Sequence, residues 1–344
     1  MAKTPTLFGA ALLIALISTA ISAQSSPTQP IVSVGQLELV AGNFSWAENL
    51  FFYGRGNLFV SDFNRGQIIR FSWLRDHNNN ASLTRQVIGR FAGVLGLDVV
   101  ATNDRLRLYA VARPFRDDTD EPGGPAIVVA SIDNATASQF EVVVNTSIIG
   151  NGLAHSNRTA SLYTACEGDF IPYFGKILQI PLAVAPPTVR TVASGLFASD
   201  GAFVSTLGGD SEFLFVSEVL TATVRVYDTA SGALLTSYKA PNMTSLDDFC
   251  IITGGLPALA PGFDFWLVGA DFTGGRVVAF ALTSSGSAVD GSAVVVGEGF
   301  QNPTSVRVGV GADWTRPNAT SLFVTEGGPL LFREDNRRLW RIDL

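Results

Sequence analysis

The feature that most constrains the fold is a short apolar stretch that returns about every fifty residues. It occurs first as LFVSD from Leu58, and it returns as LYAVA from Leu108, LYTAC from Leu162, LFVSE from Leu214, FWLVGAD from Phe265 and LFVTE from Leu322. The aromatic residues in these copies are Phe59, Tyr109, Tyr163, Phe215, Trp266 and Phe323, with spacings of 50, 54, 52, 51 and 57 residues. Propeller blades of four strands repeat at about this interval. The spacing predicts an all-β fold of six similar units.

Further strands complete each unit. Examples are GQIIRFSW from Gly66, ATVRVYD from Ala222 and GGRVVAFAL from Gly274. A solenoid or a sandwich also has regular strands, but a closed ring leaves no exposed sheet edge. Six even units of four strands therefore favour a six-bladed β-propeller.

The two ends of the repeat region indicate how the ring closes. The last unit has strands near Thr304, Leu322 and Leu339 and lacks a fourth strand. An additional strand, QLELV from Gln36, precedes the first unit. We predict that this N-terminal strand completes the last blade, so that residues 24–344 form a single propeller domain.

The first residues have the layout of a secretory signal peptide. Lys3 precedes an apolar stretch over residues 7–21, and the small residues Ser22 and Ala23 follow. The apolar stretch is shorter than the roughly 20 residues that a spanning helix needs. We therefore expect residues 1–23 to be removed and the protein to be secreted.

Seven glycosylation sequons agree with secretion. They lie at Asn43, Asn80, Asn134, Asn145, Asn157, Asn242 and Asn318. The two cysteines, Cys166 and Cys250, either pair with each other or are buried free thiols. The net charge of −7 argues against nucleic acid and anionic membranes as partners. We expect a monomer that acts on a small molecule and has no membrane span after signal cleavage.

Oxygen-bearing side chains open the innermost strands of four units. These residues are Glu48, Asn151, Asp200 and Asp247, and Asp248 follows the last of them. In a propeller these positions converge at one end of the ring, and such oxygens suit calcium, magnesium or manganese. The alternative is that Asn151-Gly152 and Asp200-Gly201 are only turns. The two histidines, His77 and His155, do not form a zinc-ligand cluster.

The units SDGAFVS…LFVSEVLTATVRVYD and LDDFCI…FWLVGADFTGGRV resemble the senescence-marker-protein, gluconolactonase and luciferin-regenerating-enzyme group. The chain is more distantly similar to paraoxonases and to strictosidine-synthase-like proteins. The resemblance spans roughly residues 40–344. It implies a six-bladed propeller that holds a divalent cation, usually calcium, at one end of its central channel. Members of the group mostly hydrolyse lactones or related esters.

The resemblance also implies roles for single residues. Glu48 matches a metal-binding glutamate, and Asp247 matches a metal-binding aspartate that also serves as the general base. Asn151 matches an asparagine that contacts substrate, or metal in paraoxonase-like members. Asp200 stands where the group usually has a metal-binding asparagine, and WAENLFF replaces its Gly/Pro-rich signature around Glu48. Because of these departures, the resemblance does not identify the substrate.

Charged residues also end the second strands of the units. They are Asp62, Arg113, Glu167, Glu218, Asp271 and Glu326. We expect each either to face the same end of the channel or to be a solvated loop charge. Asp248 points away from its neighbour Asp247, so it either supports the site from behind or is exposed.

These observations favour a secreted, metal-dependent hydrolase of a lactone or related ester, with Asp247 as the general base. A serine hydrolase is disfavoured because a Gly-x-Ser-x-Gly elbow is missing. One alternative is a non-catalytic propeller that binds a small molecule or a protein around a structural cation. Another is a condensing enzyme of the strictosidine-synthase type, in which Glu326 would be the residue of interest.

Overall fold

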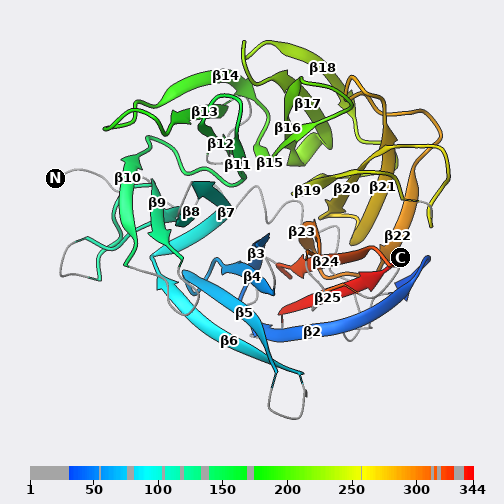
Figure 1. The fold of residues 1–344 in the computed structure, drawn as a ribbon, viewed down its shortest axis with the longest axis horizontal. Coiled ribbons are helices and arrows are strands. Elements are labelled where there is room, and N and C mark those ends of the chain that lie inside the picture. Colours follow the sequence, from blue (N-terminus) through cyan, green and yellow to red (C-terminus); the bar gives the residue numbers. More distant parts are fainter. Residues whose placement is uncertain are drawn as a thin grey trace.

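A computed structural model of the chain shows six antiparallel sheets arranged as blades around a central axis (Figure 1). The structure describes residues 31–53, 56–75, 81–102, 105–116, 120–132, 139–168, 174–256, 258–310, 314–315, 319–328 and 337–344. Within these ranges the regular structure is all strand, apart from one short 3₁₀ helix, η1 (Val219–Thr221). The predicted six-bladed β-propeller is confirmed.

Each of the first five blades is built from consecutive strands, with the innermost strand first. Blade one contains β3 (Ala47–Tyr53), β4 (Asn57–Asp62), β5 (Gln67–Arg75) and β6 (Ala81–Arg90). Blade two contains β7 (Gly93–Thr102), β8 (Arg105–Arg113), β9 (Ala126–Ser131) and β10 (Glu141–Asn145). Blade three contains β11 (Leu153–Ser156), β12 (Ser161–Cys166), β13 (Gly175–Pro181) and β14 (Arg190–Leu196). Blade four contains β15 (Ser199–Thr206), β16 (Glu212–Glu218), β17 (Thr223–Asp228) and β18 (Leu234–Lys239). Blade five contains β19 (Phe249–Thr253), β20 (Phe265–Asp271), β21 (Arg276–Leu282) and β22 (Val294–Glu298).

Blade six combines the two ends of the chain. It contains β23 (Pro303–Val308), β24 (Ser321–Glu326) and β25 (Arg337–Asp343), and β2 (Gln36–Phe44) adds the outer strand. The register pairs Gln36 with Asp343, and an ion pair joins Glu38 to Arg341. The predicted closure by the N-terminal strand is confirmed.

A second N-terminal strand, β1 (Ile31–Val32), pairs with the outer edge of β22 and gives blade five a fifth strand. The segment from β1 to β2 therefore crosses from blade five to blade six. The sequence did not predict β1, because a strand of two residues is too short to show any periodicity.

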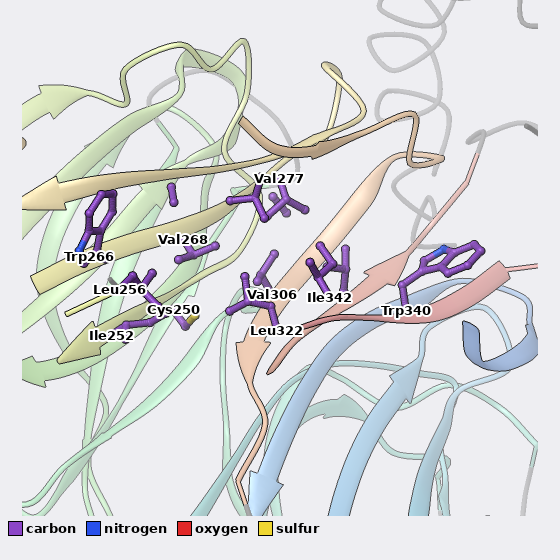
Figure 2. Close-up of a cluster of buried hydrophobic side chains, with 14 of the residues drawn as sticks. Cys250, Ile252, Leu256, Trp266, Val268, Val277, Val306, Leu322, Trp340 and Ile342 are labelled. Atoms are coloured by element: carbon purple, nitrogen blue, oxygen red, sulfur yellow. The ribbon is translucent and has the colours of Figure 1, made fainter. Parts of the chain in front are cut away.

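The repeated aromatic residues explain why the blades pack. Each lies on the second strand of its blade and is almost fully buried, because both faces of that strand lie against neighbouring blades. Figure 2 shows one such interface, where Trp266 and Val268 of blade five belong to the same buried cluster as Val306, Leu322 and Ile342 of blade six. Burying each large aliphatic side chain stabilises the fold by about 1.5–3 kcal/mol.

The predictions of a signal peptide and of glycosylation concern the N-terminus and the surface of the protein. Residues 1–23 lie outside the described residues, so the signal peptide stays a prediction. Four sequon asparagines are exposed, as glycosylation requires, namely Asn43, Asn145, Asn157 and Asn242. The other three, Asn80, Asn134 and Asn318, lie outside the described residues.

Cys166 and Cys250 are both buried free thiols, so the alternative in which they pair does not hold in this structure. Burial raises the pKa of each thiol to about 12, which leaves them protonated at neutral pH. Among the described residues, no helix is long and apolar enough to cross a membrane.

Candidate metal centre

Three carboxylates from three blades meet at one end of the ring axis. Glu48 lies on β3, Asp200 on β15, and Asp247 just before β19. One oxygen of each lies within 4.8 Å of the others, and all three side chains are at least nine-tenths buried. The structure thus brings together the three acidic residues that the sequence selected.

Glycines allow the inner strands that carry these residues to approach closely. A Cβ atom on Gly152 would lie 2.3 Å from the backbone nitrogen of Ala202, and one on Gly201 would lie 2.8 Å from the carbonyl oxygen of Asp247. The backbone N–H of Gly152 also donates to the carbonyl oxygen of Asp200, at 2.7 Å. Gly152 and Gly201 are therefore contact points between blades and not turn residues.

The three carboxylates lack compensating cations among the described residues. Asp200 Oδ1 and Asp247 Oδ1 are buried and have no hydrogen-bond partner. Burial, reinforced by the neighbouring acids, raises the pKa of Asp200 and of Asp247 well above the usual range. Burial also raises the pKa of Glu48, to about 7. Unpaired buried carboxylate oxygens are costly, and a hard divalent cation such as calcium satisfies them. The donor set therefore fits such a cation.

Asn151 lies beside the three carboxylates, just before β11. Its amide nitrogen donates to Glu48 Oε1 at 3.1 Å and to Glu167 Oε1 at 2.7 Å. Its amide oxygen accepts a hydrogen bond from Asn49 Nδ2 at 3.1 Å. Asn151 is thus held at the site, while its role as a ligand for metal or substrate stays a prediction. The same contacts bring Glu167, a second-strand end, to the edge of the cluster.

Trp46 is a residue of the site that the sequence did not reveal. Its indole Nε1 donates to Glu48 Oε2, and its ring lies 6.2 Å from that of Phe272. The one sequence signal was an aromatic residue two positions before a ligand-type glutamate.

Asp248 is not one of the three clustered carboxylates, and it is buried. Its Oδ1 accepts the backbone N–H of Phe249 at 2.8 Å. Its Oδ2 accepts from Ser305 Oγ at 2.8 Å and pairs with Arg307 Nη2 at 2.7 Å. Asp248 therefore ties the start of β19 to β23. Arg307 is far from Asp248 in sequence, so the sequence around Asp248 gave no sign of this ion pair.

Four of the second-strand ends are structural. Asp62, Glu218, Asp271 and Glu326 are all buried, whereas we expected them to be solvated or to face the site. Each accepts a backbone N–H from the loop that enters its blade. Each also pairs with an arginine that follows it, namely Arg65, Arg225, Arg276 and Arg338. Arg113, the corresponding residue of blade two, is partly buried.

No protein-family model matches the sequence, and no curated protein is significantly similar to it. Solved structures are similar in fold. A gluconolactonase from Xanthomonas campestris superposes with a TM-score of 0.59 at 16% identity, over 92% of this chain and 95% of that one. A luciferin-regenerating enzyme gives 0.58 at 15%, over 91% and 95%. Regucalcin from Agrobacterium tumefaciens, described as a calcium-binding protein, gives 0.53 at 10%, over 88% and 94%.

These similarities show the fold. The similar structures also include the PQQ domain of a pyranose dehydrogenase, so the fold alone does not select one chemistry.

Proposed function

We propose that the protein is a secreted, calcium-dependent hydrolase of a lactone or a related ester, of the gluconolactonase and luciferin-regenerating-enzyme type. The observation that carries this proposal is the pair of buried, unpartnered oxygens on Asp200 and Asp247, which lie beside Glu48 at the ring axis. Gluconolactonase, luciferin-regenerating enzyme and a calcium-binding regucalcin among the similar structures support the same reading.

Glu48, Asp200 and Asp247 would hold the cation, and Asn151 would complete its ligands or orient the substrate. A bound divalent cation polarises a carbonyl group and lowers the pKa of water. Asp247 is the proposed general base, because the resemblance to the gluconolactonase group gives it that role and its buried Oδ1 has no hydrogen-bond partner.

The reaction is a hydrolysis that needs no further reagent. A water molecule gives its proton to Asp247 as its oxygen bonds to the carbonyl carbon of the lactone. The ring C–O bond then breaks, and the departing oxygen takes the proton back from Asp247, which gives a hydroxy acid. Asp247 therefore ends the cycle ionised, as it began.

The condensing-enzyme alternative finds no support at Glu326. This carboxylate is fully buried, accepts the backbone N–H of Gln301 at 2.9 Å and pairs with Arg338 at 2.8 Å. It therefore has a structural role.

A panel of lactones and open-chain esters, assayed before and after removal of metal, tests the proposal. We expect turnover that stops on chelation, returns with calcium, and is lost in Asp247→Asn. Binding of panel compounds without turnover would overturn the proposal in favour of a non-catalytic binding module. Turnover that survives complete chelation would also overturn it.

A further inference from the structure

Trp46 occupies its position in the repeat for a reason other than the fold. The residues two places before the inner carboxylates of blades four and five are Ala198 and Ser245, which are small and buried. Blade one has the largest side chain there, and part of it remains exposed. Packing between blades does not require a tryptophan at this position, since two other blades manage without one.

The indole of Trp46 reaches over blade six toward blade five. A Cβ atom on Gly327 would lie 2.7 Å from Trp46 Cε2, so the ring lies directly against the backbone of that glycine. Beyond it lies Phe272, with ring centroids 6.2 Å apart and ring planes 34° apart. Phe272 is also partly exposed. The two rings thus bridge from the Glu48 side of the carboxylate cluster to the blade that carries Asp247.

Hydrogen bonds anchor the backbones of both residues. The N–H of Trp46 donates to Asp62 at 3.0 Å, and its carbonyl oxygen accepts from the N–H of Phe63 at 2.9 Å. The carbonyl oxygen of Phe272 accepts from Asn302 Nδ2 at 3.2 Å. The hydrogen bond from the Trp46 indole N–H to Glu48 also holds that ring beside the carboxylates, and the Phe272 ring lies next to it.

We infer that Trp46 and Phe272 form the substrate-facing wall of the site, with Trp46 also positioning Glu48 through its indole N–H. This inference rests on the proposed function and narrows its substrate class. An aromatic wall packs against the preformed ring of a lactone at a lower cost in conformational freedom than against a flexible open-chain ester. The wall therefore favours a cyclic lactone over an open-chain ester.

Two substitutions separate the role of the rings as a substrate-facing wall from the role of Trp46 in positioning Glu48. Trp46→Phe keeps a ring and removes the N–H donor, whereas Phe272→Leu removes part of the wall and leaves the hydrogen bond to Glu48. The control is Phe63→Leu, because Phe63 follows Asp62 as Phe272 follows Asp271 and packs toward Gly93 instead. Calcium affinity is measured by titration calorimetry. Specificity is the ratio of kcat/KM for δ-valerolactone to that for methyl valerate at saturating calcium.

Phe272→Leu should lower the lactone-to-ester ratio about fivefold, as expected for loss of one aromatic contact, without changing calcium affinity. Trp46→Phe should weaken calcium binding about tenfold, because a hydrogen bond to a charged group is lost. Addition of calcium should also change the tryptophan fluorescence of the wild type and not that of Trp46→Phe. Phe63→Leu should alter neither quantity.

If Phe272→Leu leaves the lactone-to-ester ratio of kcat/KM unchanged, the proposed role of the two rings in substrate binding is wrong. If Trp46→Phe leaves calcium affinity unchanged, Trp46 does not position Glu48. If the wild type hydrolyses neither compound, the proposed function and the preference for a cyclic substrate both fail. The calorimetry still decides whether Trp46 supports Glu48, so the two failures are distinguishable.

Discussion

Two sets of buried carboxylates lie at the same end of the ring and differ in their partners. The inner set, Glu48, Asp200 and Asp247, lacks a basic partner within the described part of the chain. The outer set, Asp62, Glu218, Asp271 and Glu326, has one arginine for each acid. Register brings the sets close, since Ala47 pairs with Asp62 and Ser199 pairs with Glu218.

The difference shows how one residue type serves two purposes in one fold. An outer acid joins the entering loop to an arginine, and its charge is neutralised within the blade. An inner acid has no such partner in the ranges that the structure describes, and its burial raises its pKa instead. Burial alone therefore does not mark an acid as a candidate for function, whereas burial without a partner does.

The largest effect should come from removing an outer acid. In Asp271→Ala, Arg276 loses its partner, and the backbone N–H groups of Thr244 and Ser245 lose their acceptor. We expect a loss of about 3 kcal/mol in the free energy of unfolding. Urea unfolding of the metal-free protein measures it, with Glu121→Ala as the control, because Glu121 pairs with Arg116 on the exposed surface. A decrease of less than about 1 kcal/mol in the free energy of unfolding would contradict a structural role for the outer set.

Calcium should stabilise the protein through the inner set. At a free concentration one hundred times the dissociation constant, we expect about 2.7 kcal/mol of added stability in the wild type. Asp247→Asn should lose this gain and all turnover. Paired urea curves with and without calcium provide the measurement. If Asp247→Asn is stabilised as much as the wild type, the cation binds elsewhere.

The metal-free protein should lose stability as the pH rises. The pKa of Glu48 is raised from 4.5 to about 7, so the folded state holds the proton more tightly than the unfolded state. The resulting stability is fully present below pH 4.5 and is lost as the pH rises through about 7. We expect a decrease of about 2 kcal/mol between pH 5 and pH 8. Saturating calcium should reverse the trend, because it binds the ionised carboxylates. A flat profile for the metal-free protein would show that Glu48 is compensated in some other way.

The smallest effect concerns the charge of the inner set. Three ionised carboxylates around a divalent cation leave a net charge of −1, and Asp200→Asn makes the cluster neutral. We expect calcium affinity to fall about tenfold, because carboxylate count tunes it. Turnover at saturating calcium should be preserved or raised, since less negative charge makes the cation a stronger Lewis acid. Calorimetry and lactone assays measure both. Unchanged affinity would make Asp200 a scaffold residue and the proposed site wrong.

Much of the fold could be predicted, because the information is local and repeated. The aromatic residue of each second strand fixed the number of blades, and the surplus strand at Gln36 fixed the closure. The inner carboxylates could be selected because they share one position in the repeat.

The remainder depended on contacts that no spacing reveals. Asp248 is neutralised by Arg307 from the next blade, and Trp46 reaches Phe272 across blade six. The ion pairs of the outer acids could be predicted in part, since an arginine follows each acid by three to twelve residues. The burial of these acids could not be predicted, because it depends on how the loop before each blade folds over the end of the second strand.

Closure by β2 and β25 also sets the order in which the molecule can be completed. Glu38 and Arg341 pair although they are 303 residues apart in sequence. During synthesis β2 is made long before its partner β25, while the four consecutive strands of each of blades one to five can form from neighbouring segments. Among the described strands this pairing is the most remote in sequence, and remote contacts form slowly. Until it occurs, blade six presents an open edge that can capture another chain. The nascent protein is therefore most prone to association just before its ring is sealed.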